Sequence, residues 1–95
     1  MNNVSVSGNV SEFNLSYTPK GLAVSEIVII NKFGDKQSEI TGTVFGETAE
    51  RLAQIELEGV FVSASGYLNT RENKTKTGST FRNTQFIISN IEYQE

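Results

Sequence analysis

Apolar residues alternate with polar residues along most of this chain, and that spacing constrains the fold more than any other feature. Between positions 4 and 10 the apolar side chains stand at even numbers, and between 13 and 17 they stand at odd numbers. A period of two puts alternate side chains on opposite faces of a β-strand. The change of phase at Ser11–Glu12 therefore predicts one long strand whose course is bent by a bulge.

The remaining elements follow from the same pattern, with one exception. Further strands are predicted over 22–31, 39–45, 60–68 and 81–93, separated by loops that include 17–21, 33–37 and 69–80. Between 47 and 57, Ala49, Leu52 and Ala53 instead recur at helical spacing among charged residues. We expect a short helix there, with Thr48 as its N-cap and Gly59 as its stop.

The predicted order is three strands, a short helix and two strands. The chain has 95 residues, enough for one small domain. Five strands with a helix between the third and the fourth are the arrangement of the oligonucleotide-binding (OB) fold. We therefore predict an all-β protein with one short helix, a five-stranded OB barrel that spans residues 1–95 as a single domain.

Composition argues against an enzyme. The chain has no cysteine and no histidine, so disulfides, thiolate zinc sites and the commonest general base are excluded. Carboxylates at Glu47, Glu50, Glu56 and Glu58 are the remaining candidates for acid–base chemistry or Mg²⁺. Because they are spread on and after an exposed helix, we interpret them as a solvated face. We expect no catalysis, no cofactor and no metal.

Two further features bear on location. The longest purely apolar run is Ile27 to Ile30, far shorter than the ~20 residues that span a bilayer. The N-terminal residues show no basic stretch followed by an apolar core, so no secretory signal is visible. We expect a cytoplasmic protein that does not contact a membrane.

The charge is unevenly distributed along the chain. The formal net charge is −3, and residues 1–58 carry a net −4. Residues 59–88 are different, because they carry four basic residues and only one acidic residue, Glu72, for a net +3. Phosphate binding needs cations. This segment is therefore the place where a polyanion would bind.

Several local strings together resemble a known family. They are VSGNV at 6–10, YTPKG-LAV at 17–24, VFGETAERLA at 44–53 and EGVFVSASGYLNTR at 58–71. In this order and spacing they resemble the OB core of the bacterial and phage single-stranded DNA-binding proteins. The resemblance covers the chain from Asn3 to Tyr93.

The resemblance implies a protein that coats single-stranded DNA without strong sequence preference during replication, recombination or repair. It also implies a bacterial or phage-infected cell and a homo-oligomer, a tetramer more than a dimer. The alternative is an OB protein like the primosomal accessory proteins, which acts mainly through protein–protein contacts. Replication proteins are possible partners, although the family's acidic C-terminal tail is not seen before Glu95.

Exposed aromatic rings are the first requirement of such a protein, because bases stack on them. Phe45 is the main candidate, because it shares parity with Thr41 and Thr43 and lies at the family's F-G motif. The alternative is that Phe45 covers a barrel end or a subunit contact. Tyr67 is a candidate either for stacking or for a subunit contact. Phe33 lies in a loop between two cations, Lys32 and Lys36, and the three are predicted to bind DNA together.

Cations for the phosphate backbone are the second requirement. Arg71, Lys74, Lys76 and Arg82 frame the hairpin between the last two strands, with Phe81 at its base. A basic arm with an aromatic residue can wrap a polynucleotide and release counterions. The alternative is a solvated hairpin that is kept soluble by charge.

Other positions depart from the family or have other expected roles. The family's tryptophans are replaced by Asp35, Glu39 and Asn73, and Glu47 stands where a basic residue often follows the F-G motif. Fewer rings and cations imply weaker or more salt-sensitive binding, or a shorter site. Two other aromatics are also assigned: Tyr17 resembles a common family tyrosine but is expected in the core, and Phe61 at a subunit contact or over the barrel end.

Overall fold

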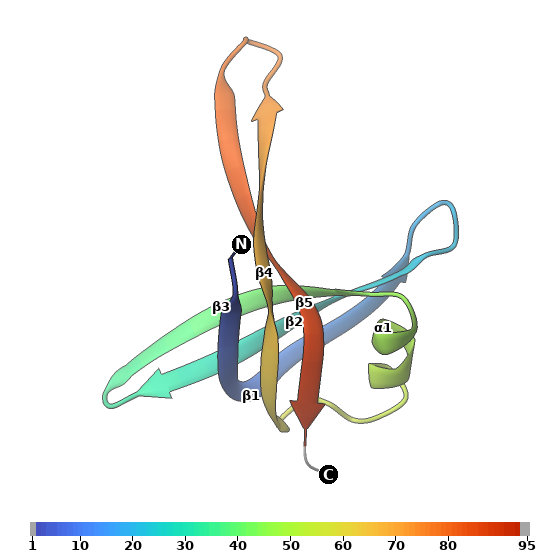
Figure 1. Cartoon of the computed structure of the whole chain (residues 1–95), viewed down its shortest axis with the longest axis vertical. Coiled ribbons are helices and arrows are strands. Elements are labelled where there is room, and N and C mark those ends of the chain that lie inside the picture. Colours follow the sequence, from blue (N-terminus) through green and yellow to red (C-terminus); the bar gives the residue numbers. More distant parts are fainter. Residues whose placement is uncertain (1, 94–95) are drawn as a thin grey trace.

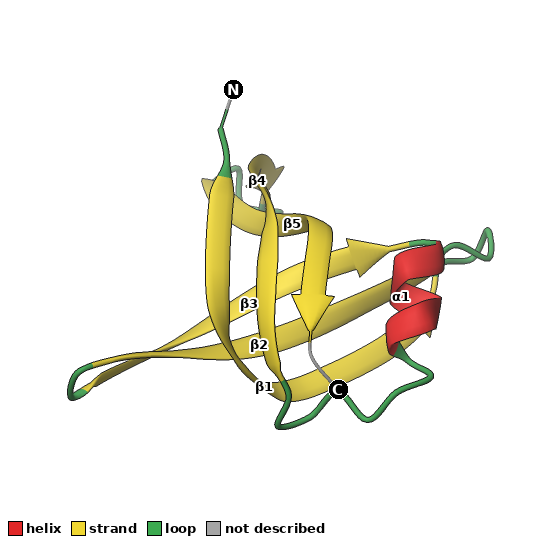
Figure 2. Cartoon of the chain, turned by 60° about the horizontal axis from the view of Figure 1, so that its bottom comes forward, coloured by secondary structure: helices red, strands yellow, loops and turns green. Residues whose placement is uncertain are grey.

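A computed structural model describes residues 2–93, apart from the side chains of Arg71, Asn73 and Phe81. Its strands and helix are β1 (Val4–Tyr17), β2 (Ala23–Phe33), β3 (Lys36–Phe45), α1 (Glu47–Leu52), β4 (Phe61–Lys74) and β5 (Thr80–Tyr93). The strands form a closed barrel in the order β1-β2-β3-β5-β4, and α1 lies beside one end of it (Figures 1 and 2). The predicted fold class, an OB-like barrel with one short helix, is confirmed.

The bend predicted in the first strand is present. The β1–β2 register shifts between Val10 and Glu12, which marks an irregularity at the position where the apolar phase changes. Because of this shift, β1 pairs with β4 through Val4–Asn9 and with β2 through Asn9–Tyr17. One long strand thus belongs to both sides of the barrel, as closure requires.

The core is filled from the inward parity of every strand. Val10, Ile27, Val44, Val62 and Ile88 belong to one buried cluster, to which α1 adds its two buried residues, Ala49 and Leu52. The alternating pattern in the sequence therefore identified the buried face of the strands, except at Tyr17 and Leu68, which are 58% and 43% exposed. The polar residues that alternate with the buried residues form the outer surface of the barrel.

The helix is shorter than the sequence predicted, and both of its predicted ends are wrong. α1 has 6 residues, its N-cap is Gly46 without a side-chain cap, and its C-cap is Ala53. The helical spacing continues past its end because Ile55 and Leu57 pack on the core from the following loop. Gly59 has a positive φ of 85° in that loop and does not end the helix. Within residues 2–93, no helix is long and apolar enough to cross a membrane.

The predicted loop at 69–80 is mostly a hairpin instead. β4 and β5 remain paired from Asn69–Gln85 to Lys74–Thr80, so only the residues between them form the turn. We call residues 69–85 the β4–β5 arm. The arm and the β2–β3 hairpin project from the barrel in different directions (Figure 1). The predicted loop at 33–37 is likewise a tight turn, since β3 begins at Lys36.

A buried hydroxyl gives a first testable prediction. The Ser25 side chain is 1% exposed, and among the described residues its Oγ has no hydrogen-bond partner. An unpaired buried hydroxyl costs about 1–3 kcal/mol of desolvation. We therefore expect Ser25→Ala to leave the free energy of unfolding unchanged or to raise it by up to about 1 kcal/mol. Urea denaturation measures the free energy of unfolding, and a decrease of more than about 1 kcal/mol would show that the Ser25 hydroxyl has a hydrogen-bond partner.

Candidate nucleic-acid interface

Phe45 lies on the outer surface of the barrel, as its parity predicted. Ile40 and Val44 point to the core, and Val44 is 1% exposed, whereas Phe45 is 42% exposed and Thr41 is also exposed. The backbone turns away directly after Phe45, because Gly46 has a positive φ of 72°. A partly exposed ring at the end of β3 is thus available for stacking.

Tyr67 lies on the same outer surface, two strands away from β3. It pairs with Ile87 on β5, and Ile87 pairs with Thr43 on β3. Neighbouring strands are about 4.8 Å apart, so the backbones of Tyr67 and Thr43 lie about 10 Å apart across the sheet, and Phe45 lies two residues beyond Thr43. Tyr67 is 45% exposed, and Ile87 is buried without belonging to the core cluster. We call Thr43, Phe45, Tyr67 and Ile87 the aromatic patch.

The β4–β5 arm begins at the aromatic patch and carries the predicted cations. Lys74 and Lys76 are exposed near its turn. Arg82 is also exposed, but its Nε donates a hydrogen bond to Glu72 Oε1 across the hairpin at 3.2 Å. Its charge is therefore partly offset by a neighbour. The backbone of Arg71 and Phe81 lies in β4 and β5, while both side chains lie outside the described part of the structure.

The third predicted group lies at the other hairpin. Lys32, Phe33 and Lys36 are exposed around the β2–β3 turn, and Phe33 is 83% exposed. Phe33 pairs with Lys36, whereas Lys32 pairs with Gln37, so the two cations lie on opposite faces of the hairpin. We call residues 32–37 the β2–β3 tip. The structure does not bring it beside the arm: Figure 1 shows the two hairpins diverging.

Two carboxylates lie on the outer surface of β2 and β3: Glu39, which replaces a family tryptophan, and Glu26, which the sequence did not single out. Glu26 pairs with Thr43 and Glu39 pairs with Ile30, and both side chains are exposed on the face that carries Phe45. Parity alone places them there, but only the strand order shows that Glu26 neighbours the aromatic patch. Glu26 lies beside this patch, opposite Thr43, and Glu39 lies between the patch and the β2–β3 tip.

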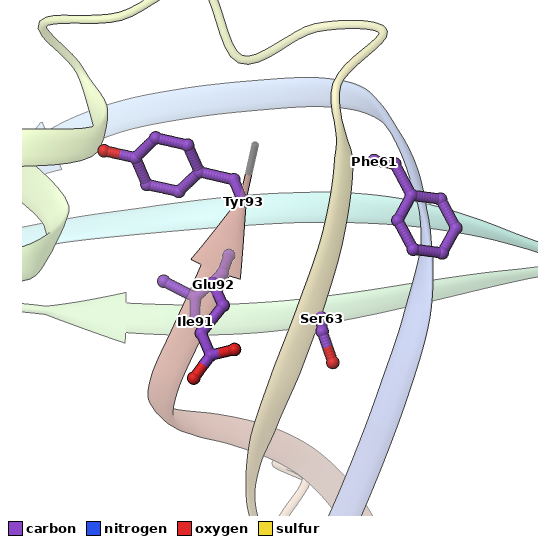
Figure 3. A pocket seen from close by; sticks show the side chains of 5 residues that line it. All are labelled: Phe61, Ser63, Ile91, Glu92 and Tyr93. Carbon is purple, nitrogen blue, oxygen red and sulfur yellow. The ribbon is translucent and has the colours of Figure 1, made fainter. Parts of the chain in front are cut away.

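Phe61 lies at a different part of the outer surface. It is 58% exposed and does not belong to the core, so the prediction that it closes the barrel end is wrong; a subunit contact stays a prediction. A hollow of about 680 Å³ beside it is lined by Phe61, Ser63, Ile91, Glu92 and Tyr93 (Figure 3). Tyr17 is 58% exposed instead of buried, because it ends β1 beyond the core.

Comparison with protein-family models and with curated proteins finds no match for this chain. The resemblance to single-stranded DNA-binding proteins therefore stays a prediction from the quoted strings. Among the described residues, no group of three or more acidic side chains is placed to hold a metal ion.

Proposed function

We propose that this chain binds single-stranded DNA without sequence preference and protects it during replication, recombination or repair. The observation that carries the proposal is the aromatic patch, with Phe45 and Tyr67 on one outer surface at the base of a hairpin with exposed lysines. Stacking on an aromatic ring tolerates every base, and each stacked base contributes about 1–3 kcal/mol. Cations along the adjacent arm would bind the phosphates.

The resemblance supplies further parts of the proposal. We infer that the protein works as a homo-oligomer in the cytoplasm of a bacterial or phage-infected cell, and that it is not an enzyme. The exposed Phe61 ring adjoins a hollow that Ile91 and Tyr93 also line, and this continuous apolar surface supports a subunit contact, since contiguous apolar patches mark interfaces. An interaction module that acts through protein contacts is the second candidate, and the hollow beside Phe61 favours it.

A fluorescence anisotropy titration with labelled oligo-dT at two salt concentrations tests the proposal. Only a few cations lie on the arm, so we expect a slope of log K against log salt of about −2. A fourfold rise in salt would then weaken binding about 10- to 20-fold. Duplex DNA of the same length should bind more weakly. Absence of oligo-dT binding at low salt would leave the protein-contact alternative as the better description.

The arm predicts a difference between its cations. Lys74→Ala combined with Lys76→Ala should reduce the steepness of the salt dependence by about 1.4, because each lost phosphate contact on a single strand removes about 0.7. Arg82→Ala should change it less, since Glu72 already offsets the Arg82 charge. The measurement is the same titration over four or more salt concentrations.

Arg51→Ala is the matched control for these variants, because Arg51 is an exposed cation on α1, away from the arm. It should leave the slope unchanged. If Arg51→Ala and the lysine substitutions reduced the steepness of the salt dependence equally, net charge alone would govern binding, and the DNA would not follow the arm.

A further inference from the structure

The outer surface of β2 and β3 is acidic between the aromatic patch and the β2–β3 tip. Along this surface Val24, Glu26, Val28 and Ile30 of β2 face Phe45, Thr43, Thr41 and Glu39 of β3. Glu12 of β1 pairs with Val28 on the same surface. Among the described residues, the first cation on this route is Lys32, which pairs with Gln37 at the far end.

The distances along this route are long for a contiguous contact. From Phe45 to Gln37 the strand covers about 26 Å, at roughly 3.3 Å per residue. Glu26 lies diagonally across from Phe45, where Cα atoms are separated by about 7–8 Å. A phosphate that followed a base stacked on Phe45 toward the tip would therefore meet Glu26 first and Glu39 later.

In the other direction, beyond Thr43 and its cross-strand partner Glu26, the described residues place no carboxylate on this surface before Glu72. From Phe45 the surface continues over Thr43 and Ile87 to Tyr67, and from there to the polar residues Asn69 and Gln85 at the start of the arm. Exposed lysines follow at Lys74 and Lys76. The arm's described carboxylate, Glu72, is already paired with Arg82.

We infer that Glu26 and Glu39 direct the polynucleotide: it runs from Phe45 across β5 and β4 to the arm, and the two carboxylates keep it off the β2–β3 tip. This inference rests on the proposed function and deepens it, because it names the residues that limit the length of the site. Lys32, Phe33 and Lys36 then form a cationic and aromatic cluster that the same bound segment does not reach. Removing the carboxylates should open a second route.

The test is a series of oligo-dT lengths titrated at low salt against the full chain and a Glu26→Gln/Glu39→Gln double variant. A carboxylate about 7 Å from a phosphate in water weakens binding about threefold, so the double variant should bind long oligonucleotides up to about tenfold more tightly. Its affinity should also keep rising to a longer oligonucleotide than that of the parent chain. Lys32→Ala should weaken the double variant and leave the parent unchanged.

A Glu56→Gln/Glu58→Gln variant is the matched control, because it removes the same charge from exposed residues in the loop after α1. It should neither bind long oligonucleotides more tightly nor increase the oligonucleotide length at which affinity stops rising (the plateau length). Equal plateau lengths for parent and double variant, with the parent binding normally, would overturn this inference and leave the proposed function intact. A parent chain that binds no oligo-dT at all would overturn both.

Discussion

Phe45→Ala is expected to weaken oligo-dT binding by about 1–3 kcal/mol, or roughly 5- to 150-fold. The reason is the loss of a stacking surface on a ring that is 42% exposed at the edge of the aromatic patch. Phe45→Tyr keeps the π-face and should restore most of the affinity. Anisotropy titration at one low salt concentration measures all three proteins.

Phe33→Ala is the matched control for this prediction. Phe33 is also an exposed phenylalanine, but it lies at the β2–β3 tip, which the inferred route does not reach, and not in the aromatic patch. Its loss should change affinity less than about twofold, within the range of an ordinary surface substitution. Circular dichroism and size-exclusion chromatography must show the same fold and assembly for each variant. Equal affinities for Phe45→Ala and the parent would refute the stacking role.

Gly66→Ala is expected to lower the free energy of unfolding by about 3 kcal/mol or more. The β4–β5 register shifts between Ser65 and Gly66, and a Cβ at Gly66 would collide with the carbonyl oxygen of Ile87. Because that neighbour is backbone, the two strands can relieve the collision only by separating. Since β5 also pairs with β3, the damage should spread to barrel closure and to the aromatic patch.

Gly78→Ala separates this effect from the general cost of replacing a glycine. Gly78 has a positive φ of 87°, but nothing lies within 4 Å of the position its Cβ would occupy. Only the backbone cost of about 1–2 kcal/mol should appear. Thermal and urea unfolding followed by circular dichroism would measure both variants. A Gly66→Ala protein as stable as Gly78→Ala would contradict the close approach of β4 and β5.

The barrel was predictable because burial imposes a period of two on each strand. The phase change at Ser11–Glu12 located the β1 irregularity, because a bulge changes which side chains point to the core without ending the strand. The arm was not predictable in the same way. Apart from Phe81 its strand residues are polar, so hydrophobic alternation is absent, and cross-strand pairs such as Thr70–Thr84 and Glu72–Arg82 hold it together.

The candidate site was predictable only in part. Parity alone indicated that Phe45 and Tyr67 face outward, and both are exposed. That they share a patch depends on the parallel β3–β5 pairing, which joins residues far apart in sequence. The Glu72–Arg82 pair depends on a register that shifts at Gly66 and could not be predicted from the sequence. Arg82 was therefore counted as an unpaired cation, although Glu72 offsets its charge. Tyr17 was misplaced because alternation continues beyond the point where the core ends.

An NMR titration of the isotope-labelled chain with oligo-dT maps the proposed binding surface residue by residue, because it reports each backbone amide separately. We predict the largest shifts at Thr43, Phe45, Tyr67 and Ile87, followed by amides along the β4–β5 arm, with small changes at the β2–β3 tip. Shifts confined to the residues around Phe61 and Tyr93, or no shifts at saturating oligo-dT, would contradict the account.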